Sequence, residues 1–204
     1  MANEVDLVVQ SLGSNPFRPL GSPVIDPGPY ETAIKLVPTE TVFYRDRGNV
    51  ALARKKYDDA IADYTKSIEL DPTYNVPWNL RGKCWEAKKE YAKAVADHEK
   101  AAQLAGKQPF YAGYHTAVAM LRAACPDAKV RDGKKALEAA RRAYDLAQGP
   151  NELAALAAAH AELGEFDQAV EWQAKEVETA PKAQKGQHEQ RLKLYQDKKP
   201  YSIE

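Results

Sequence analysis

The chain has 204 residues, and its 29 Lys and Arg residues balance 29 Asp and Glu residues, so the formal net charge is zero. The length fits one domain, and the missing basic excess argues against a nucleic-acid partner, because phosphate contacts dominate such affinity. Two cysteines, Cys84 and Cys125, are too few for a disulfide scaffold or a structural zinc site, so we expect both thiols to be free.

Residues 1–29 follow neither the helical nor the strand period and are rich in turn formers, as in GSNPFRPLGSPVIDPGP. This proline-rich head is either disordered or extended along the helices through Phe17, Leu20, Val24 and Ile25. The first residues, MANEVDLVVQ, lack the basic stretch of a secretory signal. No apolar run approaches the roughly 20 residues of a membrane span. We therefore expect a cytoplasmic protein without a membrane partner, with a signal already removed as the alternative.

Residues 30–38, YETAIKLVP, resemble a later segment at an offset of 34 residues. The matching pairs are Tyr30 and Tyr64, Ala33 and Ser67, Leu36 and Leu70, and Pro38 and Pro72. We expect a short helix at about Tyr30–Val37. It would cap the first full repeat, because a stacked repeat has an apolar face that it cannot bury alone.

The same offset relates residues 41–74 to residues 75–108. Seven pairs agree in size class: Tyr44 and Trp78, Arg47 and Arg81, Gly48 and Gly82, Tyr57 and Tyr91, Ala60 and Ala94, Tyr64 and His98, and Ser67 and Ala101. So many matches at one offset indicate a structural repeat. Each copy fits two helices, with a glycine that admits a close crossing. Asp71-Pro72 ends the second helix, because Pro disfavours helical geometry in the preceding residue.

These spacings resemble the tetratricopeptide repeat, whose signature is W-x2-L-G-x2-Y, then A-x3-F, then A and P. NELAALAAAHAELGEFDQAVEWQAKEVETAP fits the same pattern through Leu156, Ala157, Gly164, Phe166, Ala169 and Pro181. His160 and Gln173 stand where aromatics are usual, so this unit should pack less tightly. The resemblance implies an all-α superhelical solenoid of antiparallel helix pairs with about four repeats.

The third unit is irregular. Ala94 and Ala136, which take the same place in successive units, are 42 residues apart, eight more than the repeat length of 34. We expect its helices at Pro109–Ala124 and Lys134–Ala147, joined through CPDAKVRDG. The stretch LRAACPDAKVRDGKKALEAARRA resembles a variant repeat of bacterial, planctomycete-like tetratricopeptide proteins.

The expected organisation ends with a capping helix that turns Leu192 and Tyr195 toward the repeats. In chain order, the expected parts are the head 1–29, a partial capping helix 30–38, a repeat domain 41–182 with units near 41–74, 75–108, 109–149 and 150–182, the capping helix 183–198 and a tail 199–204.

No catalytic or metal-binding pattern stands out. The sequence has no H-E-x-x-H, P-loop, G-x-G-x-x-G or G-x-S-x-G motif, and no two histidines have the H-x3-H spacing. His98 and His160 take positions that aromatics occupy in the repeat, which favours packing. We expect no catalysis, no cofactor and no metal. An enzyme built on the Cys125 loop and a histidine is the remaining catalytic hypothesis.

The resemblance implies that a partner lies against the first helix of each repeat. The implied groove residues are Arg45, Asn49, Leu52, Asn79, Lys83, Glu86, Thr116, Met120, Asn151, Ala154 and Ala158. Some family members bind a carboxylate through a set of polar side chains, called a clamp, that includes an asparagine in the second unit. Leu80 stands at that position in this chain, so we predict no clamp. The expected function is a scaffold or adaptor that binds another protein or peptide, and the alternative is a structural subunit that self-associates.

Overall fold

The computed structural model describes residues 27–179 and 185–203, so the expectations for residues 1–26 lie outside the described residues. Every regular element within these ranges is helical, which confirms the all-α class. None of the described helices is long and apolar enough to cross a membrane. The chain divides after Glu90 into two compact units, here called the N-terminal and C-terminal units. The boundary falls inside the expected second repeat, 75–108.

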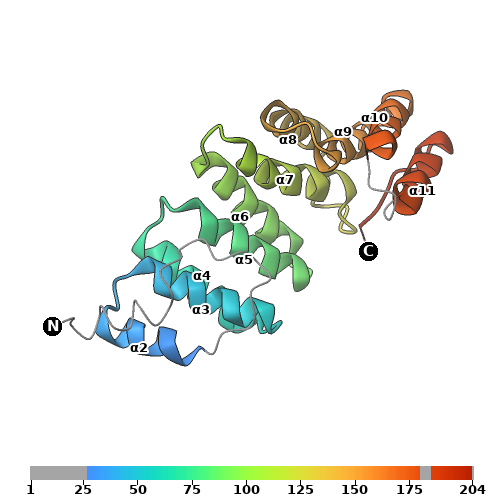
Figure 1. Cartoon of the computed structure of the whole chain (residues 1–204). Coiled ribbons are helices and arrows are strands. Elements are labelled where there is room, and N and C mark those ends of the chain that lie inside the picture. Colours follow the sequence, from blue (N-terminus) through green and yellow to red (C-terminus); the bar gives the residue numbers. More distant parts are fainter. Residues whose placement is uncertain (1–26, 180–184, 204) are drawn as a thin grey trace. The chain divides into compact units, whose positions relative to one another are not determined.

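The N-terminal unit places four helices in its described part (Figure 1). These are α2 (Gly28–Leu36), α3 (Thr41–Ala53), α4 (Tyr57–Leu70) and α5 (Asn75–Ala87). Helix α3 packs on α4 and α4 packs on α5, while the short α2 packs on α3. Tyr30 and Ala33 of α2 are buried, and α2 corresponds to the helix expected at about Tyr30–Val37. The hydroxyl of Tyr44 donates to the carbonyl of Pro38 at 3.0 Å, which fixes the turn between α2 and α3.

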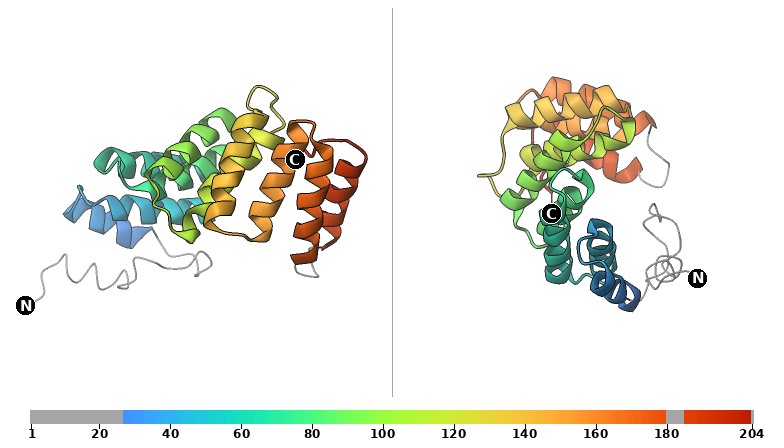
Figure 2. Two further views of the ribbon diagram at one scale, coloured as in Figure 1. Left: turned by 90° about the horizontal axis from the view of Figure 1, so that it is seen from above. Right: turned by 90° about the vertical axis from the view of Figure 1, so that its left-hand side faces the viewer.

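The C-terminal unit contains α6 (Tyr91–Leu104), a 3₁₀ turn (Pro109–Tyr111), α7 (Ala112–Ala124), α8 (Gly133–Leu146), α9 (Pro150–Glu162), α10 (Phe166–Thr179) and α11 (Lys185–Gln196). Helix α7 packs on α6, α8 and α9, and α10 packs on α9 and α11. Figure 2 shows α10 and α11 side by side. Helix α11 corresponds to the helix expected at 183–198.

The crossing of α3 and α4 depends on one glycine. Gly48 faces the ring of Tyr64, and a Cβ at this position would lie 2.7 Å from Cε1 of that ring. Tyr64 and Ala60 of α4 are both fully buried. The two helices approach closely because Gly48 leaves room for the tyrosine ring.

Four helices end in the same kind of turn, in which a residue shortly beyond the helix takes a left-handed backbone conformation. These residues are Lys55 after α3, Lys89 after α5, Gly164 after α9 and Lys198 after α11. After α3, the amides of Lys55 and Lys56 donate to the carbonyls of Leu52 and Ala51, both at 2.9 Å. Such paired bonds satisfy carbonyls that a helix leaves open at its C-terminus.

Helix α7 ends differently, at Cys125 followed by Pro126. Proline has no amide proton, so it cannot donate the bond that closes the turn after α3, α5, α9 and α11. The loop folds back instead. The amide of Asp132 donates to the carbonyl of Arg122 at 2.7 Å, and Nη1 of Arg131 donates to the carbonyl of Cys125 at 3.0 Å.

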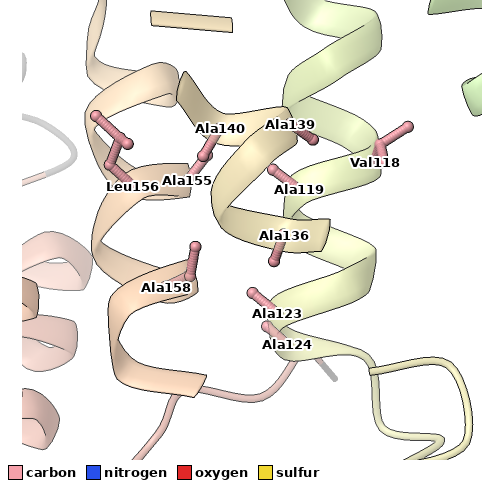
Figure 3. Packing of buried hydrophobic residues seen from close by; sticks show 11 residues of the cluster. Val118, Ala119, Ala123, Ala124, Ala136, Ala139, Ala140, Ala155, Leu156 and Ala158 are labelled. Atoms are coloured by element: carbon pink, nitrogen blue, oxygen red, sulfur yellow. The ribbon is translucent and has the colours of Figure 1, made fainter. Parts of the chain in front are cut away.

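The core of the C-terminal unit consists mainly of alanines from three helices. Figure 3 shows side chains of α7, α8 and α9 that meet in this cluster. Its buried members are Val118, Ala119, Ala123, Ala124, Ala136, Ala139, Ala140, Ala155, Leu156, Ala158 and Ala159. Small side chains let the helix backbones approach, and they bury little apolar area each, so the cluster also depends on larger residues at its margin.

Candidate functional site

The eleven groove residues implied by the sequence differ widely in exposure, and they fall in both units. The buried ones are Arg45, Asn79, Ala154 and Ala158. The partly buried ones are Asn49, Leu52, Glu86, Thr116 and Met120, and the exposed ones are Lys83 and Asn151.

In the N-terminal unit, Arg45 lies within a polar cluster rather than in open solvent. Its side chain is 8% exposed, and its Nε donates to Oδ1 of Asp46 at 2.7 Å. Its Nη1 donates to the hydroxyl of Tyr74, and its guanidinium lies 5.7 Å from the centre of the Tyr74 ring. Tyr74 precedes α5 as its N-cap residue. Arg45 therefore joins α3 to the start of α5.

Asn49 extends this cluster to α4. The hydroxyl of Tyr64 donates to Oδ1 of Asn49 at 2.9 Å, and Nδ2 of Asn49 lies 3.4 Å from Oδ1 of Asp46. Burial raises the pKa of the Asp46 carboxyl, and the charge of Arg45 offsets only part of that rise. The carboxyl is still 24% exposed. The cluster thus holds one acceptor group and one amide in fixed positions beside solvent.

In the C-terminal unit, α7 and α9 are linked through Thr116 and Glu152. The hydroxyl of Thr116 lies 3.0 Å from Oε1 of Glu152, and Glu152 is buried. Near the other end of α9, Nε of Arg131 lies 3.1 Å from Oε1 of Glu162, so the loop after α7 is also tied to α9. These bonds fix the spacing of the two helices.

Residues 199–203, here called the 199–203 segment, return from α11 to the end of α7. The amide of Ile203 donates to the carbonyl of Ala124 at 2.8 Å. Tyr201 and Ile203 pack against the alanine cluster, which contains Ala158. The implied groove residue Ala158 is therefore part of the buried core that the 199–203 segment packs against.

A buried ionisable cluster fastens α11 to α10. Glu176 is 1% exposed, and its Oε1 lies 2.7 Å from Nδ1 of His188 and 4.0 Å from Nη1 of Arg191. Its other oxygen accepts from the amide of Gln173. Burial raises the pKa of Glu176, against the opposing charges of Arg191 and His188. The role of these groups is to hold two helices together.

The thiols lack the surroundings of a reactive cysteine. Cys84 and Cys125 are free and buried, and burial raises the pKa of both. A nucleophilic cysteine instead needs a lowered pKa and an accessible sulfur. Among the described residues, no three His, Cys, Asp or Glu side chains gather into a cluster that could hold a metal ion.

Several functional candidates escaped the repeat pattern. Asp46 and Tyr74 complete the polar cluster, and Tyr201 and Ile203 cover the alanine core. The only sequence signal for Tyr201 and Ile203 is two large apolar residues separated by a serine after the final helix. Such spacing is typical of an extended segment that turns alternate side chains to one face.

Comparison with known proteins agrees with the repeat pattern. Residues 42–74 match the family model described as tetratricopeptide repeat. No curated protein sequence matches the chain. Solved structures do, at low sequence identity.

Three of these structures cover most of both chains. MamA 41-end from Desulfovibrio magneticus has a TM-score of 0.70 at 17% identity, covering 88% of this chain and 96% of that one. YrrB, described as a TPR protein with an unusual peptide-binding site, has a TM-score of 0.65 at 20% identity, covering 83% of this chain and 84% of YrrB. A thermophilic TPR protein from Thermus thermophilus has a TM-score of 0.58 at 19% identity, covering 83% of this chain and 88% of that protein. The likenesses show an all-α helical solenoid fold, and the match at residues 42–74 shows one tetratricopeptide repeat within it.

Proposed function

We propose that this chain is a non-catalytic scaffold that binds a peptide segment of another protein along the first helices of its repeats. The observation that carries the proposal is the prearranged polar cluster of α3. Arg45 holds Asp46, and Tyr64 holds Asn49, so a carboxylate and an amide stand in fixed positions. Fixed groups lose little conformational freedom on binding, which favours affinity.

The chemistry of these groups suits an extended peptide backbone. A peptide presents amide N–H donors and carbonyl acceptors along its edge. The Asp46 carboxylate accepts hydrogen bonds, whereas the Asn49 amide both donates and accepts. The exposed Lys83 of α5 adds a positive charge within the same unit. Arg45 serves as a positioning residue, because its donors are directed at Asp46 and Tyr74.

The structural relatives support this kind of function. YrrB is described by its peptide-binding site, and a further match, with a TM-score of 0.60 at 17% identity, is the Cut9–Hcn1 assembly of the APC/C. This chain covers 33% of that protein's length, so the likeness concerns only part of it.

The test is affinity capture from native lysate with three proteins side by side. The test variant is Asn49→Asp with Lys83→Ala. It keeps the acceptor for the Tyr64 hydroxyl but removes the amide donor and the exposed ammonium. The matched control is Lys66→Glu, which makes the same net charge change on the exposed face of α4. Circular dichroism confirms that all three are folded.

A protein retained by wild type and by the control, and lost by the test variant, would support the scaffold and place its partner on α3 and α5. Equal retention by all three would reject this surface. A mass that rises with concentration in sedimentation equilibrium, with no captured partner, would favour the self-associating subunit instead.

A further inference from the structure

The 199–203 segment lies on the C-terminal unit as a bound peptide would. It has no regular secondary structure, and a backbone hydrogen bond ties the Ile203 amide to the Ala124 carbonyl. Tyr201 and Ile203 are partly buried, while Ser202 between them is exposed. This alternation is the pattern of an extended chain with one face against a surface.

The segment packs against a surface of small residues, here called the alanine floor. Ala123 and Ala124 of α7 and Ala158 of α9 belong to the cluster that Tyr201 and Ile203 pack against, and Ala161 of α9 belongs to a second cluster that Tyr201 packs against. All four are 3% exposed or less. Figure 3 shows Ala123, Ala124 and Ala158 facing the space between the two helices. A floor of small side chains accepts a large apolar residue from outside without rearranging.

The end of α7 supplies a backbone anchor beside this floor. Ala124 is the last residue of α7, so its carbonyl is one of those that the helix itself leaves open to an outside donor. The Ile203 amide takes it at 2.8 Å. An apolar floor with a carbonyl at its edge recognises an extended peptide through its backbone and one side chain together.

Helix α11 supplies the side chains that surround the Tyr201 ring. The guanidinium of Arg191 lies 4.7 Å from the centre of the Tyr201 ring. Tyr195 packs against the same cluster as Tyr201 and is fully buried. Among the described residues, neither the Tyr195 hydroxyl nor Nε of Arg191 has a hydrogen-bond partner. The Tyr201 ring thus lies beside these two side chains without a hydrogen bond to either of these atoms.

The segment is also weakly held. Lys198, Lys199, Pro200 and Ser202 are exposed, so within the described chain its attachment rests mainly on two side chains and the backbone bond at Ile203. Segments with few buried contacts open at low free-energy cost, well below global unfolding.

We propose that the alanine floor is a peptide-binding site and that the 199–203 segment is its built-in competitor. A partner binds by displacing the segment. It supplies an extended stretch with an aromatic and a branched aliphatic residue two positions apart. The aromatic ring lies under Arg191, the aliphatic side chain lies on the floor, and its amide donates to Ala124. This inference rests on the proposed scaffold function and adds a second site with its own regulation.

The experiment uses the full chain and a fluorescent synthetic peptide, KKPYSIE, which repeats residues 198–204. The opened variant carries Tyr201→Ser and Ile203→Ser, which removes both anchoring side chains. Fluorescence anisotropy compares the opened variant with wild type. A site that is closed in about nine molecules of ten binds about tenfold more weakly than an open one, so we expect the opened variant to bind at least tenfold more tightly.

Two controls locate the binding. A peptide with serine at both anchor positions should not bind the opened variant. Adding Ala158→Glu to the opened variant should abolish binding, because a charged side chain then stands on the floor. If that variant does not fold, the amide signal of Ile203 in nitrogen-15-labelled wild type gives a second measurement: excess unlabelled peptide should shift it toward the position of a free segment.

Equal affinity of wild type and the opened variant would overturn the proposal, as would no binding to either. A wild type that forms dimers through this segment, with a monomeric opened variant, would also overturn it in favour of exchange between copies. The outcome is separable from that of the scaffold proposal, whose variant alters only Asn49 and Lys83. An opened variant that ignores the peptide but still captures the lysate partner would end this inference alone.

Discussion

The substitution Gly48→Ala tests the closest helix crossing in the N-terminal unit. In an open helix, alanine is more stable than glycine by about 1 kcal/mol. Here the new Cβ would lie 2.7 Å from Cε1 and 3.0 Å from Cδ1 of Tyr64. The ring is fully buried and its hydroxyl is bonded to Asn49, so it has little room to retreat. Overpacking of this kind costs about 1–3 kcal/mol.

If the clash costs the upper half of that range, the gain from alanine offsets about 1 kcal/mol of it, and the free energy of unfolding falls by about 1–2 kcal/mol. Each kcal/mol lowers Tm by about 2–4 °C in a chain of this size. Chemical and thermal unfolding followed by circular dichroism measure it. Gly113→Ala is the matched control, because its Cβ would meet nothing within 4 Å. It should stabilise by up to about 1 kcal/mol.

A double-mutant cycle shows whether contact with the Tyr64 ring causes the loss of stability in Gly48→Ala. With Tyr64→Leu already present, adding Gly48→Ala should no longer be penalised, because the ring that it strikes is gone. Equal stabilisation by Gly48→Ala and Gly113→Ala in the wild-type background would refute the crossing described here.

Three further outcomes follow from backbone geometry and burial. Lys55 has a φ of 58°, so Lys55→Gly should stabilise by about 1 kcal/mol, whereas the neighbouring Lys56→Gly should not; a loss at both positions in urea unfolding would contradict the left-handed turn. Burial raises the pKa of Cys84 to about 11, so at pH 8 its thiolate fraction is about 100-fold below that of an ordinary thiol. We expect slow labelling by iodoacetamide in the folded protein and rapid labelling in urea; fast labelling without denaturant would place the thiol at the surface. The raised pKa of Glu176, caused mainly by burial, means that its stabilising contribution is complete below about pH 4.5 and is lost as the pH rises through the folded-state value. The stability of Glu176→Gln relative to wild type should therefore increase over that window, and a difference that is flat with pH would show that the carboxyl is not desolvated.

The helix pairs could be predicted from the sequence because their cause is periodic. Tyr57 and Tyr91 stand 34 residues apart and each begins a second helix, α4 and α6. Gly48 lies at the close crossing for the same reason, since every repeat needs a small residue where its helices approach. These features recur from one repeat to the next, so a comparison of the repeats within this one chain reveals them.

The surroundings of Arg45 could not be predicted in this way. Its place within the repeat indicated a side chain open to a ligand or to solvent, yet it is 7% exposed. The reason is Tyr74, which lies before α5 and receives a hydrogen bond from the guanidinium. That contact joins two repeats and involves a residue between helices. The pattern within a single repeat therefore carries no signal for it.

The alanines of α9 show how a local irregularity can create a binding surface. Their small size is equally compatible with close packing between helices and with an open floor, and the sequence alone does not separate the two. The deciding feature lies at the end of α7, where the loop folds back and the amide of Asp132 donates to the carbonyl of Arg122. The carbonyl of Ala124, the last residue of the helix, accepts from the Ile203 amide. The end of α7 thus joins the irregular third repeat to the 199–203 segment. Tyr201→Ser with Ile203→Ser should release the segment, because its side chains then no longer pack against the alanine cluster. Faster hydrogen exchange at the amide of residue 203 would report that release, and unchanged exchange would show that the backbone bond to Ala124 holds the segment by itself.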